Sequence, residues 1–405
     1  MKKLTIPSVD DSVFVAYHCE PIREFVLDFC GSSAVFAIGT VSVPGIVARA
    51  TERDYLLLVA NALPTLLTGD VATLLDFIRK DAEFRAHHGW GAMPDHYCPP
   101  RKKEPIGSLQ GLAFCQGVLG LLFSYKCFCD DKGWQYLPSE RRLKAVAISK
   151  LEKDKSRRAS YGARWIFREV CRANDLRCCP YCNAEYVYSL EGKTSQDWMA
   201  RSPLDHFFPK SLYPYFATAL CNLIPCCSRC NSGSKLSDNP VAVALSPAGL
   251  ASVDLKMTHP YLHDLSSSGH FQYSSVSVEL MSGLSDDEVA ELEFCPTVTG
   301  SDAERANASV DEFNLLDVYS KLYGREVKDI PQRLMLLRSG YYREMVKLLA
   351  RRKRVSDDRT GLVARTVKRL LMGCELDANR INQERLSKVM IDLCRQLDPK
   401  GMIRQ

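Results

Sequence analysis

Two cysteine pairs and the residues around them dominate this sequence. The first pair lies in CPYC, residues 179–182, and the second lies in CSRC, residues 227–230. SPLDHFFPKSLYP, residues 202–214, runs between them, and NLIP, residues 222–225, comes shortly before the second pair. Two residues separate the cysteines of each pair, a spacing that turns both sulfurs toward one ion. The sequence therefore predicts a structural Zn²⁺ held by Cys179, Cys182, Cys227 and Cys230.

An additional cysteine stands directly before each pair, Cys178 before the first and Cys226 before the second. Because the C-x-x-C spacing selects the other four, these two are interpreted as small buried apolar residues or as substitute ligands. A zinc site with four thiolates has no open position, so it folds the domain and does no chemistry. The chemistry must come from residues between the pairs.

The residues between the pairs predict a small hairpin with polar side chains. Residues 202–209 are expected to form a short strand ending in a turn, with Asp205 and His206 at its polar break. Residues 222–225 predict a second short strand, and the chain after it is expected to enter a helix carrying Asn231. A hairpin and a helix around one metal would bring Asp205, His206 and Asn231 to a common centre.

This arrangement resembles the HNH nuclease family, whose fold is the ββα-metal motif. The matching residues are His206 in DHFFPKS, Asn222 in CNLIP and Asn231 in CSRCNSGSK. In this family the third position is commonly His or Asn. The form with cysteine pairs looks like HNH nucleases of bacterial anti-phage systems, such as the Septu type that works with an ATPase. Its spacing is also similar to that of the HNH domain of RNA-guided CRISPR nucleases.

The resemblance implies a catalytic role for each matching residue. His206 would be the general base that takes a proton from the attacking water. Asp205 and Asn231 would hold one Mg²⁺ or Mn²⁺ through oxygen ligands. Asn222 would fix the hairpin or orient the His206 ring. Lys210 and Lys235 are the candidates for contact with substrate phosphate. The products would carry 5′-phosphate and 3′-hydroxyl ends.

Other polar clusters are interpreted as structural. Asp95-His96 repeats the Asp-His pair but has no Asn-Leu strand or cysteine pair at the right distance. A second metal site could be formed by His87, His88, His96 and Cys98. Their spacing does not match a known metal-binding motif, so this site is not favoured.

Composition is that of an ordinary soluble protein, with 46% apolar residues, 25% charged residues and a net charge of only +5 over 405 residues. Eight of the 17 cysteines fall between Cys171 and Cys230, which indicates metal binding in a reducing cytosol rather than a disulfide framework. The N-terminus lacks the apolar run of a signal peptide. The most apolar run, Gly111–Phe123, is too short to cross a bilayer. We therefore expect a cytoplasmic protein with no membrane segment.

Positive charge is concentrated in two segments. Arg141–Arg177 has twelve basic and four acidic residues, and Arg338–Arg369 has eleven basic and three acidic residues, so each carries +8. Such segments suit a DNA backbone, but they are also typical of solvated helix faces. Both interpretations stay open for Arg141–Arg177, whereas DNA contact is favoured for Arg338–Arg369 because it is a second basic region beside the site.

The predicted fold class is α+β and mostly helical, with a ββα-metal HNH core held together by the zinc site. Four regions are expected: residues 1–105, an α/β region; 106–175, a helical segment with a basic linker; 176–245, the nuclease core; and 246–405, a helical and basic appendage. Leu109–Phe128 is expected to be a buried helix, with a partner-binding helix as the alternative.

The sequence as a whole predicts a metal-dependent HNH endonuclease that acts on DNA. The resemblance to defence nucleases adds an ATPase or sensor protein as a regulatory partner. Two alternatives need only part of the pattern: a non-catalytic zinc-ribbon module that binds nucleic acid, and a zinc-stabilised subunit that docks another protein. The joint spacing of Asp205, His206 and Asn231 favours the enzyme.

Overall fold

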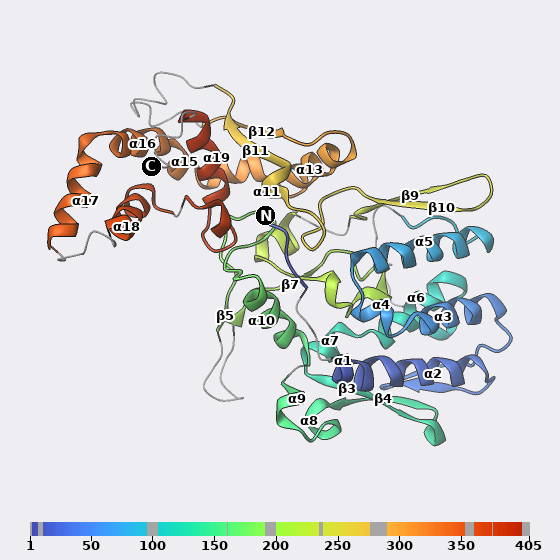
Figure 1. Ribbon diagram of the computed structural model, residues 1–405. Coiled ribbons are helices and arrows are strands. Elements are labelled where there is room, and N and C mark those ends of the chain that lie inside the picture. Colours follow the sequence, from blue (N-terminus) through green and yellow to red (C-terminus); the bar gives the residue numbers. More distant parts are fainter. Residues whose placement is uncertain are drawn as a thin grey trace.

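The computed structural model describes residues 2–6, 11–94, 104–159, 161–190, 200–234, 238–275, 290–352, 360–374 and 376–398. The chain is a mixed α+β protein, about 53% helical with small sheets, so the predicted fold class is confirmed at this level. One contiguous core of buried apolar side chains extends from Leu4 to Cys394. In Figure 1 the N-terminal helices lie at one end of the molecule, the C-terminal helix α17 (Gly340–Arg352) lies at the other, and strand β7 (Leu204–His206) lies between them.

A four-stranded sheet, in the order β2-β1-β4-β3, organises the N-terminal part. β1 (Phe36–Ile38) and β2 (Val41–Val43) form a hairpin that turns at Gly39, where φ is +60° and glycine avoids the strain of a side chain. β3 (Lys132–Leu137) pairs antiparallel with β4 (Arg142–Ala147), and β1 pairs parallel with β4. The predicted boundary at residue 105 therefore falls inside one unit, because strands from both sides of it share this sheet.

Helices cover this sheet and form the apolar interior of the same unit. α2 (Glu20–Cys30) packs against β3 and α3 (Ala50–Ala62), and α3 packs against α6 (Gly111–Leu122). α5 (Val71–His87) begins at Asp70, whose carboxylate accepts a hydrogen bond from the Thr73 backbone N–H at 2.9 Å. The 3.6-residue period of Leu74, Leu75 and Ile78 predicts this helix, and Asp70 is the capping residue that fixes its start.

The apolar stretch from residue 109 to 128 is buried, as predicted, but it forms two helices. α6 ends before Ser124, whose hydroxyl caps the backbone of the short helix α7 (Tyr125–Cys129). Phe114 and Leu122 in α6 are fully buried. Among the described residues, Gly111–Cys129 is the one helical run whose length and mean hydropathy match a membrane span, and buried core helices satisfy the same criteria.

The chain after the cysteine pairs adds two hairpins and a set of helices. β9 (Val241–Leu245) pairs with β10 (Ala251–Leu255), and β11 (Gly269–Tyr273) pairs with β12 (Leu292–Pro296). β11 packs against α19 (Ser387–Leu397), the last described helix. The last described helix thus lies beside the β11–β12 hairpin (Figure 1).

Two sequence predictions for the C-terminal helices were wrong. The capping-box spacing of Ser309 and Glu312 predicts a helix that starts there, but α13 (Ser301–Glu312) has already begun, and the Ser309 hydroxyl instead donates to Arg305 O at 2.9 Å. Apolar residues at helical spacing from Leu334 to Leu349 predict a buried stripe, but the helix ends after α16 (Ile330–Arg338), so Leu337 is buried while Leu348 on α17 is 66% exposed. A local pattern does not show where a helix ends or which face the rest of the fold covers.

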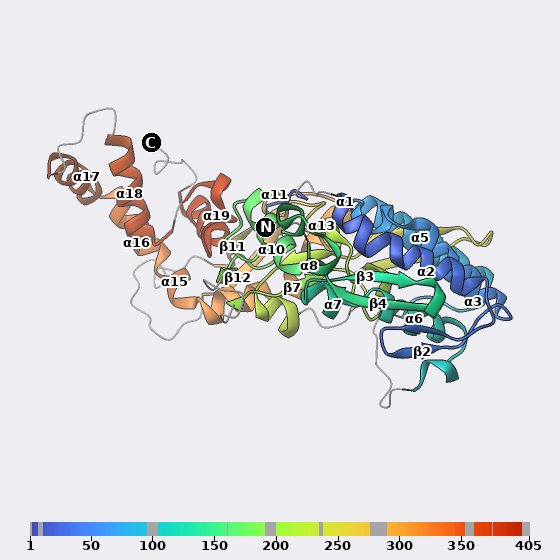
Figure 2. The same cartoon turned by 90° about the horizontal axis from the view of Figure 1, so that it is seen from below.

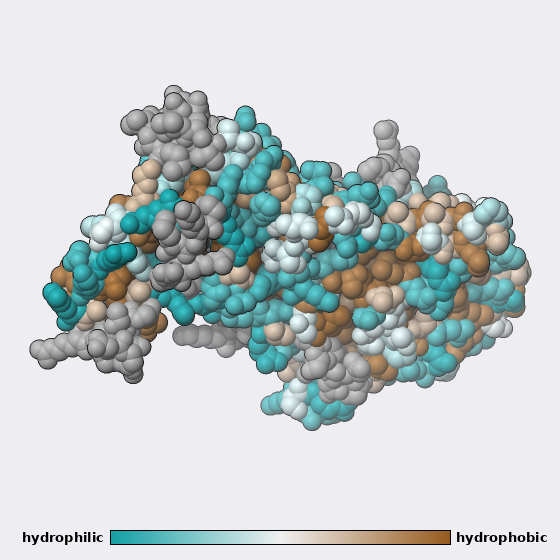
Figure 3. Space-filling view, turned by 45° about the horizontal axis from the view of Figure 1, so that its top comes forward, coloured by the Kyte–Doolittle hydropathy of each residue, from teal (hydrophilic) through white to brown (hydrophobic). Residues whose placement is uncertain are grey.

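α17 and α18 (Thr360–Met372) form the outer end of an elongated molecule (Figure 2). Several large apolar side chains are exposed there, among them Tyr341, Leu362 and Leu370. Figure 3 shows these apolar areas among hydrophilic ones at that end of the surface.

Candidate functional site

The four paired cysteines meet at one buried point. Their sulfur atoms all lie within 4.8 Å of one another, and none of the four residues is more than 5% exposed. The Sγ atoms of Cys182 and Cys227 are 3.9 Å apart. A tetrahedral ion with Zn–S bonds of about 2.3 Å needs sulfurs about 3.8 Å apart, so the cluster fits a metal ion such as zinc.

Local backbone geometry points the sulfurs inward. The Ala184 backbone N–H donates to Cys182 Sγ at 3.4 Å, and the Asn231 N–H donates to Cys227 O at 3.1 Å, which closes a helical turn around the second pair. The two pairs approach from different directions, one after α10 (Ala163–Ala173) and one at the end of the hairpin strand. A metal ion between them would join two segments that are distant in sequence.

The charges around the cluster favour thiolate, the form of cysteine that binds a metal ion. Burial raises the pKa of Cys179, while hydrogen bonds within the thiol group lower the pKa of Cys182, so the thiols compete for ionisation when packed together. Arg229 lies inside the second pair and donates to Phe313 O at 3.1 Å. Burial lowers the pKa of Arg229, but the nearby thiolates of Cys230 and Cys182 outweigh it and raise the pKa overall. The guanidinium thus balances part of the negative charge of a four-thiolate centre.

Cys178 and Cys226 stay out of the cluster, as the spacing predicted. Cys178 forms an isolated β-bridge with Tyr186, and burial raises the pKa of its thiol to about 12. The Cys226 thiol faces Pro203 O at 4.0 Å. Among the described residues the cluster contains the four C-x-x-C cysteines and no other His, Cys, Asp or Glu.

The first cysteine pair also anchors the C-terminal helices. The Tyr319 hydroxyl donates to Cys182 O at 2.5 Å. The Asn183 side chain donates to Ile381 O at 2.6 Å and accepts from the Lys388 backbone N–H at 3.0 Å. The cluster is therefore a point where the middle and the end of the chain are joined.

The predicted hairpin is present next to the cluster. β7 pairs antiparallel with β8 (Leu223–Pro225), so that Asp205 lies opposite Ile224 and His206 lies opposite Leu223. After β8 the described chain forms a π-helical turn, Cys230–Ser234, and this turn is the part of the predicted helix that the structure describes.

His206 is half-buried, and its ring orientation is defined by a backbone group. Its Nε2 atom lies 3.0 Å from Ala217 O. Because a carbonyl only accepts, Nε2 carries the hydrogen, and Nδ1 is the basic nitrogen of the neutral ring. The Tyr125 ring packs edge-on against the imidazole, with the centroids 4.5 Å apart. This tautomer and this packing are what a general base at Nδ1 requires.

Asp205 is 5% exposed and receives a hydrogen bond from Tyr181, the residue inside the first cysteine pair. The Tyr181 hydroxyl donates to Asp205 Oδ2 at 2.6 Å. The ring of Tyr181 stacks on Phe313, with the centroids 4.4 Å apart, and burial raises the pKa of its hydroxyl. Tyr181 therefore stays protonated and links the cysteine cluster to the carboxylate.

Asn222 fixes the hairpin, which is one of the two roles that the sequence left open. Its amide oxygen accepts from the Phe208 backbone N–H at 2.7 Å, and its amide nitrogen donates to Phe208 O at 3.1 Å and Phe216 O at 2.9 Å. It is fully buried. Asn222 therefore positions the hairpin through its buried hydrogen bonds.

Asn231 follows β8 along the chain, and the candidate lysine Lys210 follows β7. Asn231 is half-buried, one residue after Cys230, so the cysteine cluster fixes its backbone. Lys210 is exposed in the loop after β7, and its Nζ lies 5.3 Å from the Tyr125 ring centroid. Lys235 lies outside the described residues.

A buried hydrogen-bond chain connects the N-terminal region to His206. The Tyr161 hydroxyl donates to Lys132 O at 3.2 Å, so it accepts from His18 Nδ1, 3.1 Å away. His18 Nε2 then accepts from the Thr218 hydroxyl at 2.9 Å. Burial lowers the pKa of His18 to about 3, so the ring stays neutral. Thr218 directly follows Ala217, the residue whose carbonyl orients His206.

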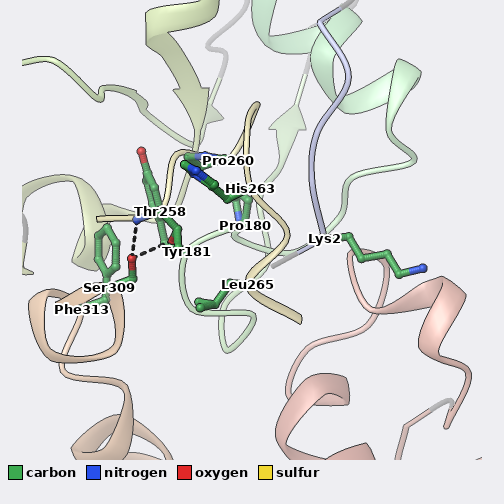
Figure 4. A pocket seen from close by; sticks show the side chains of 9 residues that line it. All are labelled: Lys2, Pro180, Tyr181, Thr258, Pro260, His263, Leu265, Ser309 and Phe313. Atoms are coloured by element: carbon green, nitrogen blue, oxygen red, sulfur yellow. Dashed lines mark hydrogen bonds between the residues drawn. The ribbon is translucent and has the colours of Figure 1, made fainter. Parts of the chain in front are cut away.

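The outer side of the first cysteine pair is closed. A narrow hollow of about 10 Å³ lies beside Pro180 and Tyr181, and His263 and Lys2 are also on its wall (Figure 4). Thr258 lies at its edge and is held by Ser309. The Thr258 backbone N–H donates to the Ser309 hydroxyl at 2.8 Å. A hollow of this size holds one water molecule at most, so it is too small to be a substrate pocket.

The remaining metal-site candidates stay without support. His87 and His88 lie at the end of α5 with their ring centroids 4.8 Å apart. His96, Cys98 and the Asp95-His96 pair lie outside the described residues. Within the described part of the chain, the four-cysteine cluster is the one group of three or more ligand side chains close enough for a metal.

Part of the positive charge in Arg141–Arg177 is paired within the chain. Arg157 lies 3.2 Å from Glu152, and Arg172 lies 2.6 Å from Glu169. The helical spacing of Trp165, Ile166 and Val170 predicts a packed face, and these side chains of α10 are buried. These ion pairs support the structural interpretation for part of the segment. In Arg338–Arg369, the residues 353–359 lie outside the described residues.

Sequence reasoning missed the residues that support the site. Tyr181 carried a signal, since it stands inside CPYC, but Tyr125, Ala217 and His18 carried none, because each is far from the motif in sequence or acts through its backbone.

Comparisons with protein-family models, curated proteins and solved structures found no match to this chain.

Proposed function

We propose that this chain is a metal-dependent endonuclease that hydrolyses phosphodiester bonds in DNA at the β7–β8 hairpin. The observation that carries the proposal is the His206 ring, held by Ala217 O in the tautomer whose Nδ1 accepts a proton, directly beside Asp205. Adjacent acid and imidazole groups on a hairpin, held by a four-cysteine cluster, are also the features that resemble HNH nucleases.

In this proposal each side chain has a separate task. Asp205 and Asn231 offer carboxylate and amide oxygens, the hard donors that Mg²⁺ or Mn²⁺ takes in proteins, so this donor set fits the implied ion. The bound ion would supply Lewis-acid stabilisation of the leaving oxygen. His206 Nδ1 takes the proton of the attacking water. Tyr181 orients the carboxylate of Asp205 through its hydrogen bond to Oδ2.

Positive charge near the hairpin suits a phosphate backbone. Lys210 is exposed next to Tyr125 and His206, where its ammonium group meets an incoming phosphate as a point charge. The proposal includes control by a partner protein, an ATPase or sensor, as in the anti-phage nucleases that the sequence resembles.

The test is cleavage of supercoiled plasmid DNA with Mg²⁺ or Mn²⁺, with the zinc content of every preparation measured. The wild type is compared with His206→Ala and with His87→Ala, a matched control at an exposed histidine. We expect nicking or linearisation by the wild type and the control, and at least a hundredfold loss, on the order of that for a general base, in His206→Ala.

Two outcomes contradict the proposal. Equal cleavage by all three proteins removes His206 as the base. DNA binding without cleavage, in zinc-loaded wild type with and without co-purifying protein, favours the alternative of a non-catalytic zinc module.

A further inference from the structure

A second candidate site lies in the N-terminal part, away from the cysteine cluster. A cavity of about 100 Å³ is bounded by α5, by the turn after it, by the loop between β7 and β8, and by β9. Most of its wall is apolar, and it is formed by Ile78, Ala82, Met93, Tyr213 and Val243. The polar exceptions are Asp81 and Arg85, one turn apart on α5.

Arg85 is almost completely buried in this wall and is poorly satisfied. It is 1% exposed, and its Nη1 donates only to the thioether of Met93, at 3.5 Å. Its Nε lies 3.8 Å from Asp81 Oδ2, which is longer than a hydrogen bond. Nε and Nη2 have no hydrogen-bond partner among the described residues. Burying such a guanidinium edge costs free energy unless a hydrogen-bond acceptor pairs with its N–H groups.

Asp81 meets this demand only in part, because its Oδ2 lies beyond hydrogen-bond distance of Arg85 Nε. The Tyr55 hydroxyl donates to Asp81 Oδ1 at 2.5 Å, and burial raises the pKa of the Asp81 carboxyl. Arg85, with two donor nitrogens that lack a hydrogen-bond partner among the described residues, therefore lies on the wall of a mostly apolar cavity.

The Nε/Nη2 edge of arginine matches a carboxylate, which it binds through two parallel hydrogen bonds. A cavity of about 150 Å³ accommodates benzene, so this one holds a ligand of roughly four to six non-hydrogen atoms. We propose that the cavity binds a short-chain monocarboxylate, with its carboxylate on Arg85 and its chain against Ile78 and Val243. Water alone is a poor occupant because the apolar wall offers it few partners.

The cavity also touches the loop that orients His206. Tyr213, on its wall, lies in the β7–β8 loop and donates to Asn239 Oδ1 at 2.9 Å. Ala217, four residues later, holds the His206 ring. A bound carboxylate thus restrains the loop of the hairpin site. This consequence rests on the proposed function, whereas the binding does not.

The experiment measures binding to the purified full chain with propionate as the probe and its neutral isostere propionamide as the matched ligand. Calorimetry, the Tm and the NMR signal of the Arg85 Nε–H group are followed during titration. We expect propionate to raise the Tm and shift the Nε–H signal, and we expect propionamide to bind at least about tenfold more weakly, because it lacks the charge.

Two variants separate the electrostatic and the steric parts of the site. Arg85→Met removes the donors, and Ala82→Leu fills the cavity while keeping Arg85; propionate binding should be lost in both. If Arg85→Met does not fold, propionate binding to Ala82→Leu and the Nε–H signal of the wild type still test the proposal. The proposal is overturned if propionate leaves the wild type unchanged, if propionamide binds equally well, or if propionate binding persists in Ala82→Leu. None of these readouts requires nuclease activity, so failure here is distinct from failure of the proposed function.

Discussion

The four-cysteine cluster and the hairpin site are adjacent, since Tyr181 lies within the first and donates to Asp205 in the second. They differ in how they are built. The cluster consists of side chains from two short turns, and it requires little beyond their approach. The hairpin site depends on the backbone of its own loop at Ala217 and on groups from distant segments, such as Tyr125 and His18.

This difference explains why a cysteine cluster is easier to predict from sequence than the environment of a histidine. A C-x-x-C pair contains its own ligand geometry within four residues. The reactivity of a histidine depends on what each ring nitrogen faces, and those partners are set by packing. Variants can test whether the two sites are as independent as this comparison implies.

The largest effect is expected from the cysteine cluster. Cys227→Ser should lose the metal ion, and because structural zinc contributes several kcal/mol or more to folding, the variant should be unfolded or strongly destabilised. Zinc content and thermal unfolding provide the measurement.

Cys226→Ser is the matched control, because Cys226 is the neighbouring residue and lies outside the cluster. It should keep one zinc ion per chain and a Tm near that of the wild type. Equal zinc content in the two variants would contradict the assignment of the ligands.

The next largest effect is expected at Asn222. Asn222→Ala removes three buried hydrogen bonds and leaves backbone groups of Phe208 unsatisfied, so the free energy of unfolding should fall by about 3 kcal/mol. Denaturant unfolding checks this value. Asn231→Ala, at a half-buried position, should change stability by less than about 0.5 kcal/mol while abolishing cleavage under the proposed function. Similar stability losses in both variants would show that the two asparagines share a structural role.

A smaller effect, dependent on pH, is expected from His18. Its folded pKa of about 3 lies below that of an ordinary histidine, so below about pH 6.5 the unfolded chain takes up a proton that the folded chain refuses. The contribution of this histidine to stability is therefore fully present above about pH 6.5 and falls by roughly 1.36 kcal/mol for each pH unit below it.

Denaturant unfolding of the wild type and His18→Gln between about pH 7 and pH 5 measures this contribution. The variant should lose less stability than the wild type as pH falls, whereas His87→Gln, at an exposed histidine, should follow the wild type. Parallel curves for all three proteins would refute the neutral buried state of His18.

The smallest effect is expected from Lys210→Ala. The side chain is exposed, so the free energy of unfolding should stay within about 0.5 kcal/mol of the wild type. If Lys210 contacts phosphate, the slope of log binding constant against log salt should decrease in magnitude by about one unit. Lys80→Ala, on the exposed face of α5, is the control. An unchanged slope would remove Lys210 from the DNA-contacting residues.

Sequence reasoning was most successful where the determinants are local. The hairpin strands and the buried apolar run from residue 109 to 128 follow from short patterns of apolar residues and breakers, and the structure contains them. It failed at the boundary placed at residue 105, because the pairing of β1 with β4 joins segments about a hundred residues apart and leaves no trace in either segment.

The sequence by itself therefore determined which four cysteines form the cluster and that Asp205 and His206 are neighbours, since the C-x-x-C spacing and chain connectivity fix them. Only the tertiary structure decided which nitrogen of His206 carries the hydrogen, which hydroxyl holds Asp205, and that Asn222 is buried. The physical reason is that hydrogen-bond partners and burial arise when distant segments pack together, and no spacing along the chain encodes them.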